Sequence, residues 1–122
     1  MVRKFQELQI AIKEVIIMNE LENKILQIYC KHNFNWLCGY IPLPSTVIQS
    51  ELNVSLYKVR KAIKTLKDEG YLKSETYVDK NDYGNIIVRG YLITEQAKET
   101  EIYKQCERDE DNFIKELYAS EE

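Results

Sequence analysis

The sequence lacks long apolar runs and a recognisable secretion signal. Its longest purely apolar run, residues 15–18, is far shorter than the roughly 20 residues that a membrane-spanning helix needs. Arg3 and Lys4 are basic, but Glu7 and Lys13 interrupt the segment that follows, so we expect no signal peptide. These absences predict a protein without a membrane partner.

Cysteine is also scarce. Cys30, Cys38 and Cys106 form an odd, scattered set, which argues against a disulfide framework and favours a cytoplasmic protein with reduced thiols. His32 lies between two of them in a C-x-H-x5-C order, but structural zinc sites use tighter ligand pairs. We therefore expect no metal and no cofactor. A Gly-rich phosphate loop, a Ser/His/Asp set and a paired-carboxylate motif are also missing, so the sequence does not predict an enzyme.

The net charge of −3 hides a strong asymmetry. Residues 55–73 contain six basic and two acidic side chains, whereas residues 95–122 contain four basic and ten acidic ones. A basic segment in an acidic protein points to a localised anionic partner. The plainer alternative is a solvated, lysine-rich helix face.

The first third of the chain has helical periodicity followed by a loop. Apolar residues recur at the helical period over residues 2–18 and 20–31, which predicts two helices. Residues 32–44 lack this period and contain Gly39 and two prolines, so we expect a loop with a short extended piece near Tyr40.

The aromatic residues of this region form a further pattern. They predict a local cluster packed in the core, and the alternative is a pocket for a small effector that the sequence does not identify. These residues are Tyr29, Phe34, Trp36 and Tyr40.

The middle of the chain has the signals of two helices joined by a tight turn. We expect Ser45 to cap a short helix that ends near Leu52, and Asn53 to form the turn. Ser55 then caps a longer helix that Gly70 ends. The buried stripe of this helix, at spacing i, i+3, i+4 and i+7, is Val59, Ala62, Ile63 and Leu66.

A β-hairpin and a last helix follow. Residues 71–78 and 86–93 are rich in β-branched and aromatic side chains, and residues 79–85 have strong turn chemistry. We expect Thr94 to cap a helix that reaches about Tyr118, with a polar break at residues 109–112.

This order of elements predicts a mainly α protein with a small β-hairpin, a winged helix-turn-helix with extra N-terminal and C-terminal helices. The expected units are an N-terminal helix over residues 1–19, a DNA-binding domain over 20–94 and an acidic C-terminal helix over 95–122.

In such a fold the second helix enters the major groove of double-stranded DNA. Ser55 and the free N–H groups at its start would bind a phosphate. We expect Tyr57, Lys58 and Lys61 to face bases and the other basic side chains to face phosphates. The predicted DNA-binding residues are Ser45, Ser55, Tyr57, Lys58, Arg60, Lys61, Lys64 and Lys67.

The hairpin, or wing, supplies a second candidate contact. The groups able to approach the minor groove or its phosphates are Lys80, Asn81, Asn85 and Arg89. DNA would repel the carboxylates of Glu75, Asp79 and Asp82, so we expect little affinity from the wing. The plainer alternative is a hairpin that only completes the core.

Residues 43–72, LPSTVIQSELNVSLYKVRKAIKTLKDEGYL, resemble the DNA-binding domain of GntR-type regulators. The resemblance implies that Ser55 and Arg60 contact the DNA backbone and that Tyr57 and Lys58 face bases. The segment departs from that family in two ways. It lacks an Arg early in the bracing helix, and Leu56 stands where the family has another.

The later segment RGYLITEQAKET, residues 89–100, resembles the wing exit of MarR- and PadR-type regulators. Those families have a helix before the helix-turn-helix and a C-terminal helix that dimerises. The resemblance therefore implies the same roles for the terminal helices of this chain.

Surplus apolar residues on both terminal helices predict a two-fold homodimer, which would place two recognition helices in successive major grooves. The alternative is that both helices pack on their own domain. The expected interface residues are Phe5, Leu8, Ile12, Ile102, Phe113 and Leu117.

These features together predict a bacterial or phage transcriptional regulator that binds an operator in double-stranded DNA as a dimer. Two alternatives stay open. One is a winged-helix module of a replication or mobile-element protein, and the other is a winged helix used only for protein–protein contact.

Overall fold

The computed structural model describes residues 19–120. The predicted helix over residues 2–18, with Phe5, Leu8 and Ile12, lies outside this range. The elements in chain order are α2 (Glu20–Asn33), α3 (Ser45–Leu52), α4 (Leu56–Asp68), β1 (Leu72–Asn81), β2 (Gly84–Ile93), a short 3-10 helix η1 (Gln96–Glu99) and α5 (Glu101–Ser120). This order confirms a mainly helical winged helix-turn-helix.

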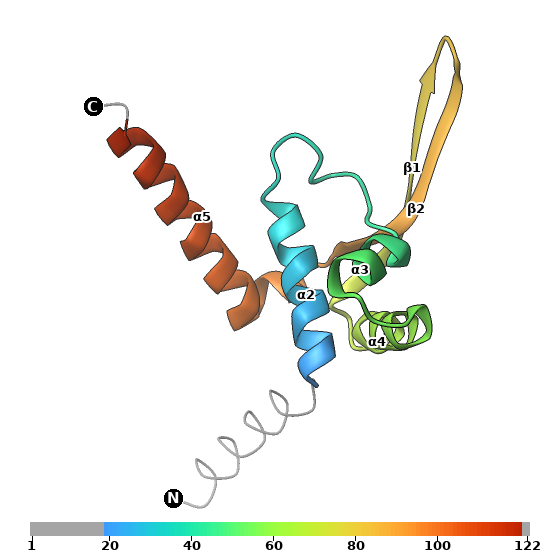
Figure 1. Ribbon diagram of the computed structural model, residues 1–122, viewed down its shortest axis with the longest axis horizontal. Coiled ribbons are helices and arrows are strands. Elements are labelled where there is room, and N and C mark those ends of the chain that lie inside the picture. Colours follow the sequence, from blue (N-terminus) through green and yellow to red (C-terminus); the bar gives the residue numbers. More distant parts are fainter. Residues whose placement is uncertain (1–18, 121–122) are drawn as a thin grey trace, which may run out of the picture.

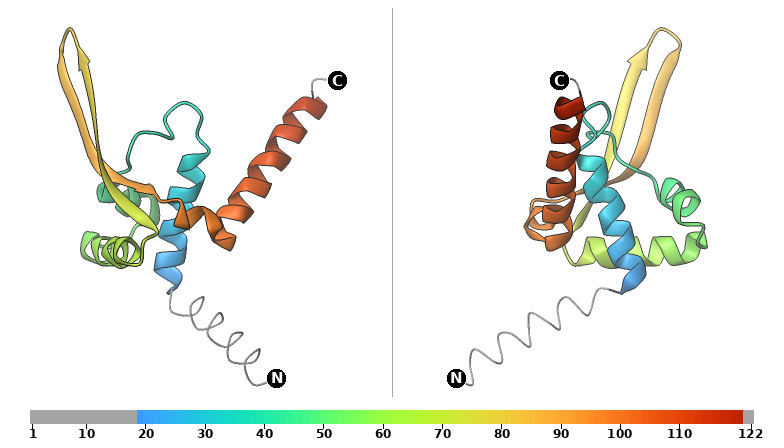
Figure 2. Two further views of the ribbon diagram at one scale, coloured as in Figure 1. Left: turned by 180° about the vertical axis from the view of Figure 1, so that it is seen from behind. Right: turned by 60° about the vertical axis from the view of Figure 1, so that its left-hand side comes forward.

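Helix α2 lies at the centre of the molecule (Figure 1). Helices α3 and α4 and the hairpin lie on one side of it, and α5 lies on the other. The two further views agree and show the hairpin and α5 both extending away from the body (Figure 2).

Helix α2 begins at a capping box. The Glu22 N–H donates to Asn19 Oδ1 (2.8 Å), and the Asn19 N–H donates to the Glu22 carboxylate (3.1 Å). Two free donors at the helix start are therefore satisfied reciprocally. Asn19 thus caps the helix predicted over residues 20–31. The helix begins at Glu20 and continues to Asn33.

The tight turn between α3 and α4 forms where expected. Asn53 adopts the left-handed conformation (φ 53°), which asparagine tolerates better than most residues. Ser55 caps α4, with its Oγ accepting from the Lys58 N–H at 3.3 Å. The prediction for Ser45 is wrong: it is the first residue of α3, and Pro44 holds the cap position without a side-chain hydrogen bond.

Helix α4 ends at Asp68, and the turn that terminates it contains Gly70. The Tyr71 N–H donates to the Leu66 carbonyl (2.9 Å) and the Gly70 N–H to the Lys67 carbonyl (3.0 Å), the two bonds of a Schellman motif. This motif needs a positive φ, and Gly70 has one of 87°.

One core holds α2, α3, α4 and the base of the hairpin together. It contains the whole predicted stripe of α4, each residue of which is at most 4% exposed. Other members come from α2, α3, the hairpin, η1 and α5, and they include Ile25, Leu26, Ile48, Leu72, Ile93, Ala97 and Cys106.

The hairpin is longer, and its turn shorter, than predicted. Ten-residue strands β1 and β2 pair in register from Leu72↔Ile93 to Asn81↔Gly84, so only Asp82 and Tyr83 form the turn. The residues expected in a seven-residue loop are mostly strand because cross-strand pairing continues through them. The extended piece expected near Tyr40 lies instead at Leu43, which bridges to Tyr91.

The last helix breaks at a different place from the predicted one. The Ala97 N–H donates to Thr94 Oγ1 (3.3 Å), so Thr94 supports η1. The Tyr103 N–H donates to Thr100 Oγ1 (3.2 Å) at the start of α5. Residues 109–112 are continuous helix, because polar residues on an exposed face do not interrupt the backbone hydrogen bonds.

The predicted aromatic cluster does not form. Tyr29 is buried, but Trp36 is 88% exposed. Phe34 stacks on Tyr103 with ring centroids 5.1 Å apart, and Tyr40 contacts Tyr77 edge-on at 5.5 Å. Phe34 and Tyr40 therefore contact different elements, α5 and β1. Within residues 19–120 no helix is both long and apolar enough to cross a membrane.

Candidate nucleic-acid interface

Helix α4 exposes its basic side to solvent. Each predicted contact from Ser55 to Lys67 is exposed, including Tyr57 at 75%. Ser45 is partly buried in the first turn of α3. Among residues 19–120, no ion pair uses a cation of α4. These cations are therefore not neutralised by carboxylates of the described chain.

The buried stripe sets the direction of each side chain on α4. With 3.6 residues per turn, the positions opposite the stripe are Tyr57, Lys61, Lys64 and Asp68. Arg60 and Lys67 lie on one flank of this outward row, and Lys58 and Thr65 lie on the other. The geometry thus groups Lys64 with Tyr57 and Lys61, whereas we expected from the sequence that Lys64 would contact phosphates.

The Ser55 hydroxyl can still donate one hydrogen bond while it caps α4. Its Oγ accepts from the Lys58 N–H, so its hydroxyl proton stays available to donate. The first N–H groups of the helix have no intrahelical acceptor and carry the positive end of the helix dipole. An anion at this end would meet both kinds of donor.

The register of the hairpin separates the wing's charges. Directly opposite residues share a face, and faces alternate along a strand. One face carries Leu72 and Ile93 at its base, where they enter the core, and Lys80 and Arg89 farther out. We call this the basic face. Its register pairs are Leu72↔Ile93, Ser74↔Tyr91, Thr76↔Arg89, Val78↔Ile87 and Lys80↔Asn85.

The opposite face, called here the acidic face, carries Glu75 and Asp79. Lys73 on this face pairs with Glu75 at 3.8 Å. Tyr40 covers part of the same face, and its hydrogen bond with Tyr77 raises the pKa of Tyr77. The two strand carboxylates therefore point away from Lys80 and Arg89, which the sequence alone does not reveal.

Neither Asn81 nor Asp82 belongs to the basic face. Asn81 pairs with Gly84 in the register of the acidic face, and its Oδ1 accepts from the Tyr83 N–H at 2.9 Å. This side chain stabilises the turn, so part of its hydrogen-bonding capacity is already used.

Helix α5 carries six carboxylates and lies on the far side of α2 from α4 (Figure 1). Arg108 contacts Glu101 at 2.6 Å and lowers the pKa of that carboxyl. Ile102 is partly buried against the core of its own chain, whereas Phe113 is 55% exposed. Leu117 is also exposed. The first half of α5 thus packs against the core of its own chain, whereas the second half exposes apolar side chains.

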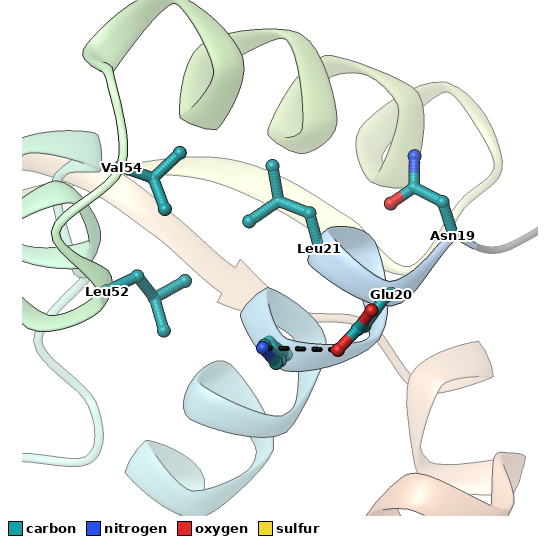
Figure 3. A pocket seen from close by; sticks show the side chains of 6 residues that line it. Asn19, Glu20, Leu21, Leu52 and Val54 are labelled. Atoms are coloured by element: carbon teal, nitrogen blue, oxygen red, sulfur yellow. Dashed lines mark ion pairs between the residues drawn. The ribbon is translucent and has the colours of Figure 1, made fainter.

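A pocket of about 390 Å³ opens between the first turn of α2 and the turn that joins α3 to α4 (Figure 3). Leu21, Leu52 and Val54 point into it, and the Lys24–Glu20 ion pair (3.3 Å) lies beside them. None of the aromatic residues that suggested an effector pocket lines it.

All three cysteines are free thiols. Cys30 and Cys106 are buried, and burial raises the pKa of Cys30 to about 12 and also raises that of Cys106. His32 contacts the Ile41 carbonyl through Nε2 at 2.6 Å. Among the described residues no three His, Cys, Asp or Glu side chains gather as a metal site would require.

No protein-family model matches this sequence, and no curated protein matches it. The resemblances to GntR-, MarR- and PadR-type regulators therefore stay predictions from their motifs. Among solved structures, ZitR from Lactococcus lactis in an apo form aligns with a TM-score of 0.48 and 16% identity, covering 98% of this chain and 76% of that one. The adhesin competence repressor from Streptococcus pyogenes aligns with a TM-score of 0.48 and 18% identity, covering 93% and 78%. At identities this low, the functions of those proteins are not transferred to this chain.

Proposed function

We propose that this chain is a transcriptional regulator that binds a specific site in double-stranded DNA through α4. The observation that carries the proposal is the arrangement of α4: an apolar stripe buried in the core and an outward row that contains Tyr57, Lys61 and Lys64. A helix held this way presents donors to base edges in a major groove. The flanking Arg60 and Lys67 are placed to bind phosphates.

The charge distribution supports the same proposal. The basic residues of α4 and of the wing's basic face lie on the side of α2 opposite the acidic helix α5 (Figure 1). DNA could therefore approach α4 without meeting the carboxylates of α5, and the attraction would fall as salt screens it.

We further propose that the regulator acts as a dimer through the outer half of α5. The apolar stripe that packs Ile102 and Cys106 against the body continues to Phe113 and Ile114, which are exposed. A second copy would cover this continuation and pair two α4 helices for a two-fold operator. The N-terminal residues Phe5, Leu8 and Ile12 belong to the same proposal on sequence grounds alone.

The DNA proposal is tested by selecting bound sequences from a random duplex pool and then titrating the best site against salt. We expect one enriched motif and an affinity that falls steeply with salt. A variant with Arg60→Ala and Lys61→Ala should bind more weakly, whereas Lys115→Ala on α5 should bind as the unchanged protein does. Absence of duplex binding at low salt would refute the proposal, and binding without any preferred motif would refute its sequence-specific part.

The dimer is tested by light scattering after size-exclusion chromatography. Phe113→Ser with Ile114→Ser should lower the mass at micromolar concentration, and Lys115→Ser, on the opposite side of α5, should not. A monomer in the unchanged protein would contradict the dimer while leaving DNA binding by single copies open to measurement.

A further inference from the structure

The free part of the wing carries an exposed apolar pair on its basic face. Val78 and Ile87 are direct cross-strand partners and are 49% and 55% exposed. Opposed side chains on a hairpin lie about 5 Å apart, so the two form one continuous apolar ridge. Solvent-facing strand positions are usually polar, and this ridge therefore needs an explanation.

Polar and cationic groups bracket this ridge. Toward the tip lie Lys80 and its partner Asn85, and toward the base lie Thr76 and its partner Arg89. No carboxylate belongs to any register pair of the basic face. An apolar ridge flanked by cations suits a partner that has an anionic surface and an apolar interior.

The hairpin can carry the ridge well beyond the body. Val78 lies six residue steps along the strand from the buried Leu72, which corresponds to about 20 Å of strand. Figures 1 and 2 show the outer hairpin standing clear of all the helices. The ridge is therefore free to enter a groove beside the site that α4 would occupy.

Stacked bases flanked by phosphates have the required chemistry. Proteins that bend DNA from the minor groove combine basic and amide side chains with an apolar wedge placed between base steps. We propose that the wing bends double-stranded DNA by inserting the Val78–Ile87 pair into the minor groove, with Lys80, Asn85 and Arg89 on the groove walls. This activity rests on the proposed DNA binding and adds DNA deformation to it.

The wing's two faces supply a matched experiment. Ile86 is 52% exposed, nearly as much as Ile87, but it belongs to the acidic face. Ile87→Ser and Ile86→Ser therefore remove the same side chain from adjacent, similarly exposed positions on opposite faces. A double variant, Val78→Ser with Ile87→Ser, removes the whole ridge and leaves Lys80 and Arg89 in place.

The bend angle is measured by energy transfer between dyes at the two ends of the selected duplex, at protein concentrations that saturate it. The unchanged protein and Ile86→Ser should both bend the duplex by about 20–90°. Ile87→Ser should reduce the bend, and the double variant should abolish it. Because all three side chains are exposed, we expect each variant to keep the fold. Thermal unfolding of each variant is the control that checks this.

The outcomes separate this inference from the DNA-binding proposal. A straight duplex that is bound tightly by the unchanged protein overturns the inference and leaves the proposed function standing. Equal bends in the unchanged protein and the double variant also overturn it, and would leave the ridge as a contact for protein. Absence of any duplex binding overturns both.

Discussion

The hydroxyl of Tyr29 donates a hydrogen bond of 2.9 Å to the carbonyl of Leu43. The same carbonyl accepts from the Tyr91 N–H at 3.0 Å. One oxygen atom therefore connects the central helix α2 to the base of the wing. Tyr29 is 1% exposed, and this burial raises the pKa of its hydroxyl.

We expect Tyr29→Phe to lower the free energy of unfolding by about 0.5–1.5 kcal/mol, because it removes one buried hydrogen bond without opening a large cavity. Urea denaturation monitored by circular dichroism measures the change. Tyr83→Phe, at the 99% exposed wing tip, is the matched control and should change the value by less than about 0.5 kcal/mol. Equal effects of the two substitutions would contradict the role given to the hydrogen bond.

Gly70→Ala should destabilise the fold through two separable effects. An alanine at φ +87° costs about 1–2 kcal/mol by itself. Its Cβ would also lie 2.5 Å from Gln96 Oε1 and displace the side chain whose Nε2 donates to the Glu69 carbonyl at 3.0 Å. In a Gln96→Ala background the same substitution should cost less but still destabilise. A cost that disappears in this background would mean that the backbone conformation contributes nothing.

Lys64→Ala and Lys67→Ala should affect DNA binding differently. Lys64 lies in the outward row of α4, so its loss should relax the preference at one base position, by about 1–3 kcal/mol. Lys67 lies on the flank, so its loss should weaken binding to all sequences and reduce the salt slope by about 1. Competition binding with single-base variants of the selected site distinguishes the two. The reverse pattern would show that the outward row does not face the bases.

The three cysteines should differ in their reaction with alkylating reagents. Only a thiolate reacts, and the raised pKa of Cys30, from 9.0 to about 12, leaves about a thousandfold less thiolate at neutral pH. Cys38 is partly exposed and should be alkylated first in the folded protein, as peptide mass spectrometry would show. Cys30 should become reactive on denaturation. Rapid alkylation of Cys30 in native conditions would contradict its burial.

The same shift predicts a dependence of stability on alkaline pH. The folded state holds the Cys30 proton more tightly than the unfolded state, whose thiol has a pKa near 9.0. This contribution to stability is therefore complete below about pH 9 and is lost as the pH rises toward 12. Urea midpoints measured between pH 8 and pH 11 should fall progressively, and a constant midpoint would contradict the prediction.

Local signals predicted the part of the site that lies on α4. Ser55, Asn53 and Gly70 act through backbone hydrogen bonds and dihedral angles within a few residues of themselves, so their roles can be read from the sequence. The stripe from Val59 to Leu66 was also predictable, because helical geometry alone decides which residues share a face.

Non-local packing decided what the sequence could not. The exposure of Trp36 depends on which elements reach the loop that carries it, and the break at Thr100 depends on where η1 docks against Glu69. Composition alone predicted that carboxylates would offset the cations of the wing. Its cross-strand register places Lys80 and Arg89 on one face and Glu75 and Asp79 on the other, because a pleated strand alternates its side chains and only the pairing partner determines what stands beside each one.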